Sequence, residues 1–179
     1  MITIKLKQNF DLEKLIKNVN NSTSIMLNDV AQIIKEGWDE EINSGSFESL
    51  KTATTDLHGS HRPLKLTGKL AKSNKILPST PDKLKAVVHN TAKSSKNYKV
   101  RKPNGKIHKG TRKSPAVFYG YYQNYGFKTA SNSLIPNRTV PARDFTSKTI
   151  DNLGKNPKYI KANKKFAKNL NQSMKKASK

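Results

Sequence analysis

Histidine and carboxylate side chains are the groups of this chain that could carry out catalysis or hold a metal. The sequence has four histidines and no cysteine, which excludes disulfides, thiol catalysis and zinc sites built from cysteine. His58 and His61 lie three residues apart, but no third ligand follows them at the spacing of a zinc motif. The sequence also lacks a nucleophile elbow, a P-loop and a dinucleotide-binding signature. We therefore expect a protein that is not an enzyme and that uses no metal or cofactor.

The acids gather at one place, where Glu36, Asp39 and Glu40 are followed by Glu41. Their spacing of three to four residues puts them on one side of a helix. A solvated face, or a surface that forms salt bridges with another subunit, explains this group better than acid–base catalysis does.

Basic side chains dominate the composition, with 35 Lys+Arg against 12 Asp+Glu and a formal net charge of +23. Such an excess attracts polyanions, so nucleic acid, an acidic protein and an anionic membrane are all candidate partners. Lysine also accumulates in chains from AT-rich genomes, which offers a compositional explanation for part of the charge. Lysine outnumbers arginine, and base recognition favours the planar fork of arginine. Any contact with DNA is therefore expected to be phosphate-directed and non-specific.

A basic hairpin is predicted at residues 91–114, because Asn104-Gly105 is a strong turn signal between two short extended segments. Its candidate contacts to DNA or to an acidic partner are Lys99, Arg101, Lys102, Lys106, Lys109 and Arg112. A central strand is predicted at residues 116–127, where the tyrosines are Tyr119, Tyr121, Tyr122 and Tyr125. They could stack on bases, although positions in a core or an interface explain them better.

The N-terminal part of the chain predicts a strand followed by helix. Ile2, Ile4 and Leu6 alternate with polar residues, which is the period of a half-buried strand. Asp11 can then cap a helix whose apolar residues recur every three or four positions as far as Ile42. The polar residues 20–24 interrupt this pattern weakly, so one long helix and two helices in tandem are both compatible with it. Gly45 is the expected end of the helix.

Further elements follow in a regular order. We expect a long loop over residues 46–65, a short helical turn at 66–73 capped by Thr67, and strands at 75–77 and 83–90. A short helix is expected over 145–153. The C-terminal segment predicts a basic amphipathic helix with an apolar stripe made of Tyr159, Phe166, Leu170 and Met174, with Ile160 and Ala167 adjacent. Because this stripe is thin and lacks tryptophan, it is expected to pack on protein rather than on a membrane.

Three short motifs follow one another along the chain. The first contains Thr67, Gly68, Leu70 and Ser73; the second contains Tyr119, Gln123, Tyr125 and Gly126; the third contains Pro141, Ala142, Arg143 and Phe145. Their order over residues 1–155 resembles the tailed-phage virion-morphogenesis family, which includes tail-completion and minor tail proteins of the head–tail joint. The chain departs from the family pattern at Gly120 and Asp144, where the family has alanine and proline.

The resemblance implies an α+β fold, with a small, mostly antiparallel sheet packed with a long N-terminal helix and C-terminal helices. The basic hairpin would protrude from a single domain over residues 1–155, and residues 156–179 would form a lysine-rich amphipathic helix or tail. The resemblance also implies a hexameric ring of identical copies in the virion, at the head–tail junction or tail end. It would be assembled in the host cytoplasm and would contact connector, neck and tail-tube proteins.

Two other hypotheses remain at this stage. One is a lysine-rich protein that binds nucleic acid without sequence preference, and the other is a binding module of a mobile element. No apolar run approaches the roughly 20 residues that span a bilayer, so no membrane partner is expected.

The third motif, "VPARDF", combines stiff, charged and apolar residues. Pro141 keeps the preceding chain extended, Arg143 can reach carboxylates or backbone carbonyls, and Asp144 can cap the next helix. Val140 and Phe145 are expected to anchor the two sides of the turn. We therefore predict a subunit or partner interface made of Glu36, Asp39, Glu40, Arg143, Asp144 and Phe145. A purely intramolecular turn is the alternative.

Overall fold

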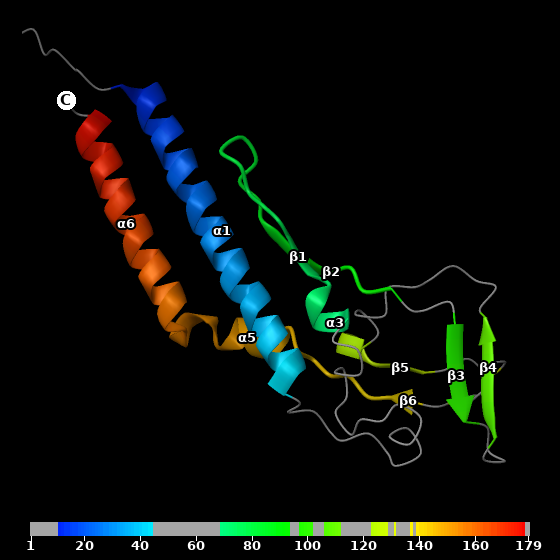
Figure 1. Cartoon of the computed structure of the whole chain (residues 1–179). Helices are drawn as coiled ribbons and strands as arrows, with labels where there is room; N and C mark the ends of the chain where they lie inside the picture. The colour runs from blue at the N-terminus through cyan, green and yellow to red at the C-terminus, as the bar shows by residue number, and fades with distance from the viewer. Residues whose placement is uncertain are drawn as a thin grey trace, which may run out of the picture. The chain divides into compact units, whose positions relative to one another are not determined.

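The computed structural model of the chain describes residues 11–44, 69–93, 97–101, 106–111, 123–128, 131, 137 and 139–177 (Figure 1). Within these residues the elements are long helices and short strand pairs, which confirms the predicted α+β class. The described strands form three separate two-stranded sheets rather than one small sheet. The chain divides into two compact units, and the long N-terminal helix contributes to both of them.

Helix α1 (Leu12–Ser44) is one uninterrupted helix, so the polar residues 20–24 do not break it. The Asp11 carboxylate accepts a hydrogen bond from the Lys14 backbone N–H at 2.9 Å, which confirms the predicted cap. Ser22 and Ser24, within the polar segment, are buried. Residues 20–24 contain no apolar side chain, so the apolar pattern alone predicts a weak interruption of the helix. The helix continues because the buried serines of this segment pack against other parts of the chain. The predicted strand at 2–6 and the expected end at Gly45 lie outside the described residues.

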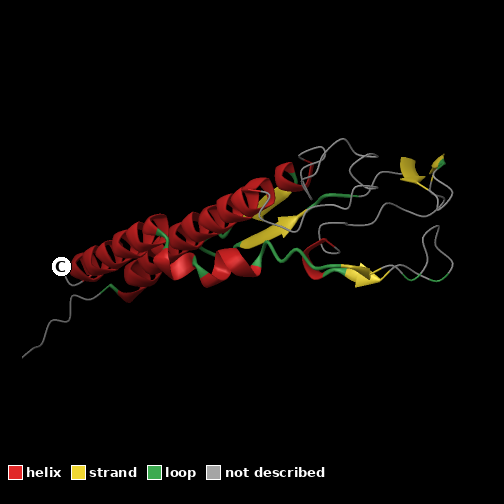
Figure 2. Cartoon of the chain, turned by 90° about the horizontal axis from the view of Figure 1, so that it is seen from below, coloured by secondary structure: helices red, strands yellow, loops and turns green. Residues whose placement is uncertain are grey.

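The first unit comprises residues 11–33, 76–87 and 153–177 of the described chain. After a 3-10 turn, η1 (Leu153–Lys155), helix α6 (Pro157–Ala177) lies alongside α1 in both views (Figures 1 and 2). The Asp11 N–H donates to the Ala177 carbonyl at 3.2 Å. The start of α1 therefore meets the end of α6, and the two helices run antiparallel.

The buried face of α6 differs in part from the predicted stripe. Ala162, Ser173 and Ala177 are its buried residues, and Phe166 is half-buried beside them. Met174, which the pattern placed in the stripe, is 59% exposed. The prediction is wrong for Met174. Small residues form much of the packed face of α6, and a search for periodic large apolar side chains does not detect them.

Strand β1 (Asn74–Leu77) pairs with β2 (Val87–Asn90). The sequence predicted strands at 75–77 and 83–90, and the second strand is shorter than predicted. The connection between them is fixed to α1 at Ser79, which is 4% exposed. The Asn28 side-chain amide donates to the Ser79 carbonyl at 3.0 Å and accepts from the Ser79 N–H at 2.7 Å. The Ser24 hydroxyl donates to the same carbonyl at 3.0 Å. Polar side chains of the helix thus satisfy a buried piece of loop backbone.

The second unit comprises residues 34–44, 69–75 and 88–152 of the described chain. Its elements include helix α3 (Lys69–Lys72) and helix α5 (Ser147–Asp151). The core is made of Ile42, Leu70, Ala71, Ala92 and Phe145, with Trp38 packed against it. The rings of Trp38 and Phe145 meet edge to face, with centroids 6.0 Å apart.

The aromatic segment after the basic hairpin does not form the predicted strand over its described part. Residues 123–125 form a helical turn, and only Phe127–Lys128 (β5) is extended, paired with Thr139–Val140 (β6). The prediction is wrong there because the side chains of Gln123 and Asn124 bond to a later loop instead of alternating across a sheet. Residues 116–122 lie outside the described chain.

Candidate assembly site

Gly126 brings the second motif into backbone contact with the third. Its φ is +71°, a conformation that favours glycine. A Cβ at this position would lie 2.7 Å from both the Ala142 nitrogen and the Val140 oxygen. The close approach of these two segments therefore requires glycine.

Arg143 bonds to the second motif with both its backbone and its side chain. Its backbone N–H donates to the Gln123 carbonyl at 2.9 Å and also to the Asn124 carbonyl at 3.2 Å. Its Nη1 donates to the Gln123 side-chain oxygen at 2.8 Å. The sequence predicted that the fork of Arg143 reaches carboxylates or backbone carbonyls. In the structure Nη1 of the fork reaches a side-chain amide oxygen, and the backbone carbonyls of Gln123 and Asn124 accept from the backbone N–H instead.

The polar side chain of Asn124 joins the same contact. It is 3% exposed, accepts from the Thr146 N–H at 3.2 Å and donates to the Thr146 hydroxyl at 2.9 Å. Asp144 accepts from the Ser147 N–H at 3.1 Å at the start of α5, which confirms its predicted capping role. Arg143 and Asp144 are the polar residues of this turn for which the sequence predicted contacts. Both of them have partners within the chain itself.

The first motif reaches the third through the core. Leu70 is 1% exposed and Phe145 is 2% exposed, and both belong to the same buried cluster. The three motif segments therefore lie together in a region that we call the motif junction, made of Leu70, Gln123, Asn124, Gly126 and residues 140–146. Thr67, Gly68 and Tyr119 lie outside the described residues.

The predicted interface is wrong for the side chain of Phe145, which the core of its own chain encloses. Pro141 and Ala142 are exposed, as is Tyr125 at 64%. The outer surface of the motif junction is therefore formed by these residues, whereas the apolar anchor points inward.

Asp39, predicted to face a neighbouring subunit, holds together elements of its own unit. Its carboxylate accepts from Lys35 Nζ at 2.7 Å and from the Asn74 side chain at 2.8 Å. Asn74 is 1% exposed and accepts from the Asn90 side chain at 2.6 Å. The carboxylate is thus largely satisfied by the chain itself. The bonds of Asn74 to Asp39 and Asn90 could not be predicted from the sequence, because they join positions 35 and 16 residues apart.

The other acids of the group differ in exposure. Glu41 lies 3.7 Å from Lys148 Nζ, Glu36 is half-buried and Glu40 is exposed. Of the predicted interface acids, Glu40 is the one whose place on the surface suits a contact with another molecule.

The basic hairpin is confirmed over its described residues. Strand β3 (Asn97–Arg101) pairs antiparallel with β4 (Ile107–Thr111), and the register sets Lys99 opposite Lys109 and Arg101 opposite Ile107. Lys106 is exposed at the start of β4. Lys102, Arg112 and the Asn104-Gly105 turn lie outside the described residues, and the DNA contact stays a prediction.

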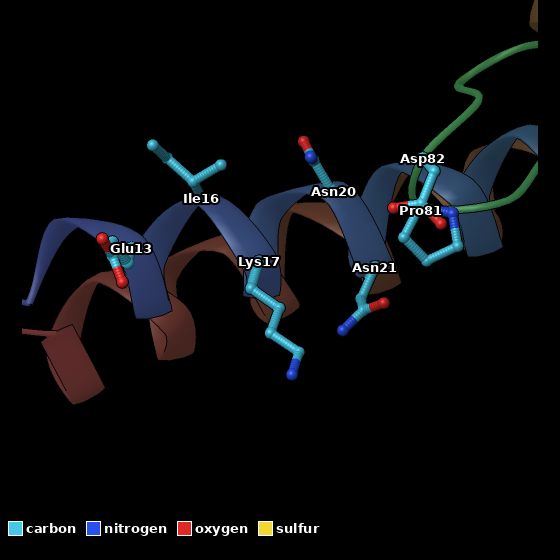
Figure 3. Close-up of a pocket in the computed structure, with 7 residues that line it drawn as sticks. All are labelled: Glu13, Ile16, Lys17, Asn20, Asn21, Pro81 and Asp82. Atoms are coloured by element: carbon cyan, nitrogen blue, oxygen red, sulfur yellow. The ribbon is translucent and has the colours of Figure 1, made fainter.

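An open pocket of about 520 Å³ lies beside the first turns of α1 (Figure 3). It is lined by Glu13, Ile16, Lys17, Asn20, Asn21, Pro81 and Asp82. Figure 3 shows Ile16 and Asn20 pointing to one side of the helix and Lys17 and Asn21 to the other, so the polar groups do not converge on one point. In the described part of the chain, no three His, Asp or Glu side chains are grouped to hold a metal ion.

Comparisons of the chain with protein-family models, with curated proteins and with solved structures found no match.

None of the described helices has an apolar stretch long enough to cross a bilayer.

Proposed function

We propose that this chain is a non-enzymatic structural protein of the head–tail junction of a tailed phage, of the tail-completion or tail-terminator type. In this role, identical copies form a hexameric ring that joins the tail to the head. The observation that carries the proposal is the motif junction. Residues from three motifs whose order resembles the morphogenesis family contact one another at Leu70, Gly126 and Arg143.

The distribution of apolar surface supports assembly. Seven large apolar side chains of the first unit are between 41% and 59% exposed: Leu12, Ile16, Ile25, Leu77, Leu84, Ile160 and Met174. Large apolar side chains that are exposed on a protein surface can be buried in contacts with other proteins. Burying them against identical copies would stabilise the folded chain by mass action.

The charge distribution supports a contact between unlike faces. A closed ring uses heterologous contacts, in which one surface meets a different surface of the next copy. Glu40 is exposed on α1, and Lys106 and Lys109 are exposed on the basic hairpin. An acidic group on one copy and a basic group on the next would form such a pair.

A charge reversal on α1 tests this arrangement. Native mass spectrometry of the full chain should show that Glu40→Lys lowers the fraction of oligomer at about 150 mM salt, because it replaces attraction with repulsion. Glu13→Lys, an equal charge change at another exposed position of α1, is the matched control and should leave the oligomer unchanged. Equal behaviour of both variants would show that Glu40 is not in the contact.

The competing function is a lysine-rich nucleic-acid-binding protein that acts without assembly. A wild-type chain that stays monomeric, and that remains bound to duplex DNA at about 150 mM salt, would favour it over the proposed ring.

A further inference from the structure

The lysines of α6 form one continuous face of that helix. They are Lys158, Lys161, Lys164, Lys165, Lys168, Lys175 and Lys176, and each of them is exposed. At about 100° per residue they fall within an arc of roughly 120° around the helix axis. The helix carries no acidic residue. We call this set the lysine face.

The opposite side of α6 is used for packing in the first unit. Ala162, Ser173 and Ala177 are buried, and the midpoint of their arc lies about 130° from the midpoint of the lysine face. Lys165, at the edge of the lysine face, lies 3.5 Å from Asp29 of α1 and its side chain is 58% exposed. The middle of the lysine face is therefore turned away from α1.

The positive charge of this face is little compensated within the described chain. Lys161, Lys164, Lys168 and Lys176 form no ion pair with any described residue. Lys161, Lys164 and Lys168 are spaced by three and four residues, and like charges at this spacing destabilise a helix. An anionic partner would remove this repulsion.

We infer that the lysine face of α6 binds the phosphate backbone of duplex DNA without reading its sequence. From Lys158 to Lys176 the helix rises about 27 Å, which is roughly one lysine per 4 Å. Duplex DNA carries one phosphate per about 3.4 Å along each strand, so the two charge densities are similar. The face has no arginine to recognise base edges and no aromatic ring on which unpaired bases could stack.

Duplex DNA fits this face better than an anionic membrane does. A helix that lies on a bilayer inserts a broad apolar face beside its basic one. Here the apolar and small residues centred on Ala162 and Phe166 pack within the first unit, and the exposed remainder is a narrow stripe of Ile160, Ala167 and Met174. The inference goes beyond the proposed function, because such a face would act in a monomer as well as in a ring. It also moves the expected DNA contact from the β3–β4 hairpin to α6.

The salt dependence of DNA binding tests the inference. Fluorescence anisotropy with a labelled duplex of about 20 base pairs would be measured on the full chain between about 50 mM and 200 mM salt. The test variant combines Lys161→Gln, Lys164→Gln, Lys168→Gln and Lys176→Gln. We expect the slope of log K against log salt to become shallower by about 3, and the affinity at about 50 mM salt to fall at least 100-fold.

The matched control removes four positive charges from the hairpin, with Lys99→Gln, Arg101→Gln, Lys106→Gln and Lys109→Gln. Both variants have the same net charge, so a larger loss in the α6 variant locates the contact and is the expected result. Equal losses, a larger loss in the hairpin variant, or a wild-type chain that does not bind the duplex would overturn the inference. Circular dichroism would check that both variants keep their helix content.

Binding to vesicles of anionic lipid forms a second arm of the experiment. If wild type bound the vesicles but not the duplex, and the α6 variant lost that binding, the face would be a membrane contact and the DNA inference would be wrong.

Discussion

The two units of this protein are stabilised by different kinds of packing. The second unit packs large side chains, with Phe145, Ile42 and Leu70 almost fully buried and Trp38 against them. The first unit packs small and polar residues, such as Ala31, Ala162 and Ser173, and leaves large apolar side chains exposed. The motif residues lie in the unit with the large core, whereas the lysine face of α6 and most of the exposed large apolar side chains lie in the other. The contrast is between a unit held by a large apolar core and a helical pair that leaves apolar and cationic side chains exposed.

The strongest test of this contrast removes the aromatic anchor of the second unit. Phe145→Ala should lower the free energy of unfolding by about 3–5 kcal/mol, because a fully buried ring is lost and a cavity remains. Urea unfolding followed by circular dichroism would measure the change. Ile150→Ala is the control at a 50% exposed position and should change stability by less than about 1 kcal/mol. A small effect of Phe145→Ala would show that the second unit does not depend on this core.

Gly126→Ala tests the contact between the second and third motifs. We expect a loss of about 2 kcal/mol or more, since the added Cβ meets backbone atoms and the positive φ is strained for alanine. Gly154→Ala is a matched control, because nothing lies within 4 Å of a Cβ at that position. Thermal unfolding of the two variants would compare them, and similar midpoints would contradict the close approach described for Gly126.

Asn74→Ala tests the buried polar network of the second unit. The substitution removes the donor to Asp39 and the acceptor for Asn90, so a loss of about 1–3 kcal/mol is expected from the buried groups left without partners. Asn152→Ala, at an exposed position, serves as the control for a lost asparagine side chain. Urea unfolding would show no difference between the two if the network were unimportant.

The smallest effect is expected for the ion pair between the helices of the first unit. Lys165 and Asp29 are 3.5 Å apart and their side chains are 58% and 41% exposed, so solvent screens their attraction. A double-mutant cycle with Lys165→Ala and Asp29→Ala should give a coupling free energy within about 0.5 kcal/mol. A coupling several times larger would mean that α6 is held on α1 by charge rather than by its small buried residues.

Local sequence patterns predicted much of the fold. Neighbouring residues were sufficient to predict the two long helices, the caps at Asp11 and Asp144, and the basic hairpin. They also predicted two strands where β1 and β2 lie. These features depend on interactions a few positions apart, which is why periodicity and capping residues are sufficient to find them.

The remaining features depend on residues far apart in the chain. The Asn28–Ser79 and Asp39–Asn74 hydrogen bonds join positions separated by 51 and 35 residues, and no short sequence pattern predicts them. The turn at 123–125 has a strand-like composition around it, but its conformation is fixed by Arg143 and Thr146. Of the candidate site, the sequence identified Gln123, Gly126 and Arg143, whereas Asn124 was missed as a bonding partner. The sequence alone could not distinguish a buried position of Phe145 in its own core from a position in an interface. Its packing with Ile42, Leu70 and Trp38 makes that distinction.

We propose that identical copies of this chain form a closed ring. Native mass spectrometry of the wild-type protein over a series of salt and protein concentrations, with and without short duplex DNA, tests it most directly. The account predicts one dominant closed oligomer, a hexamer, that forms without DNA at about 150 mM salt. A chain that stays monomeric at every protein concentration, with or without DNA, would contradict it.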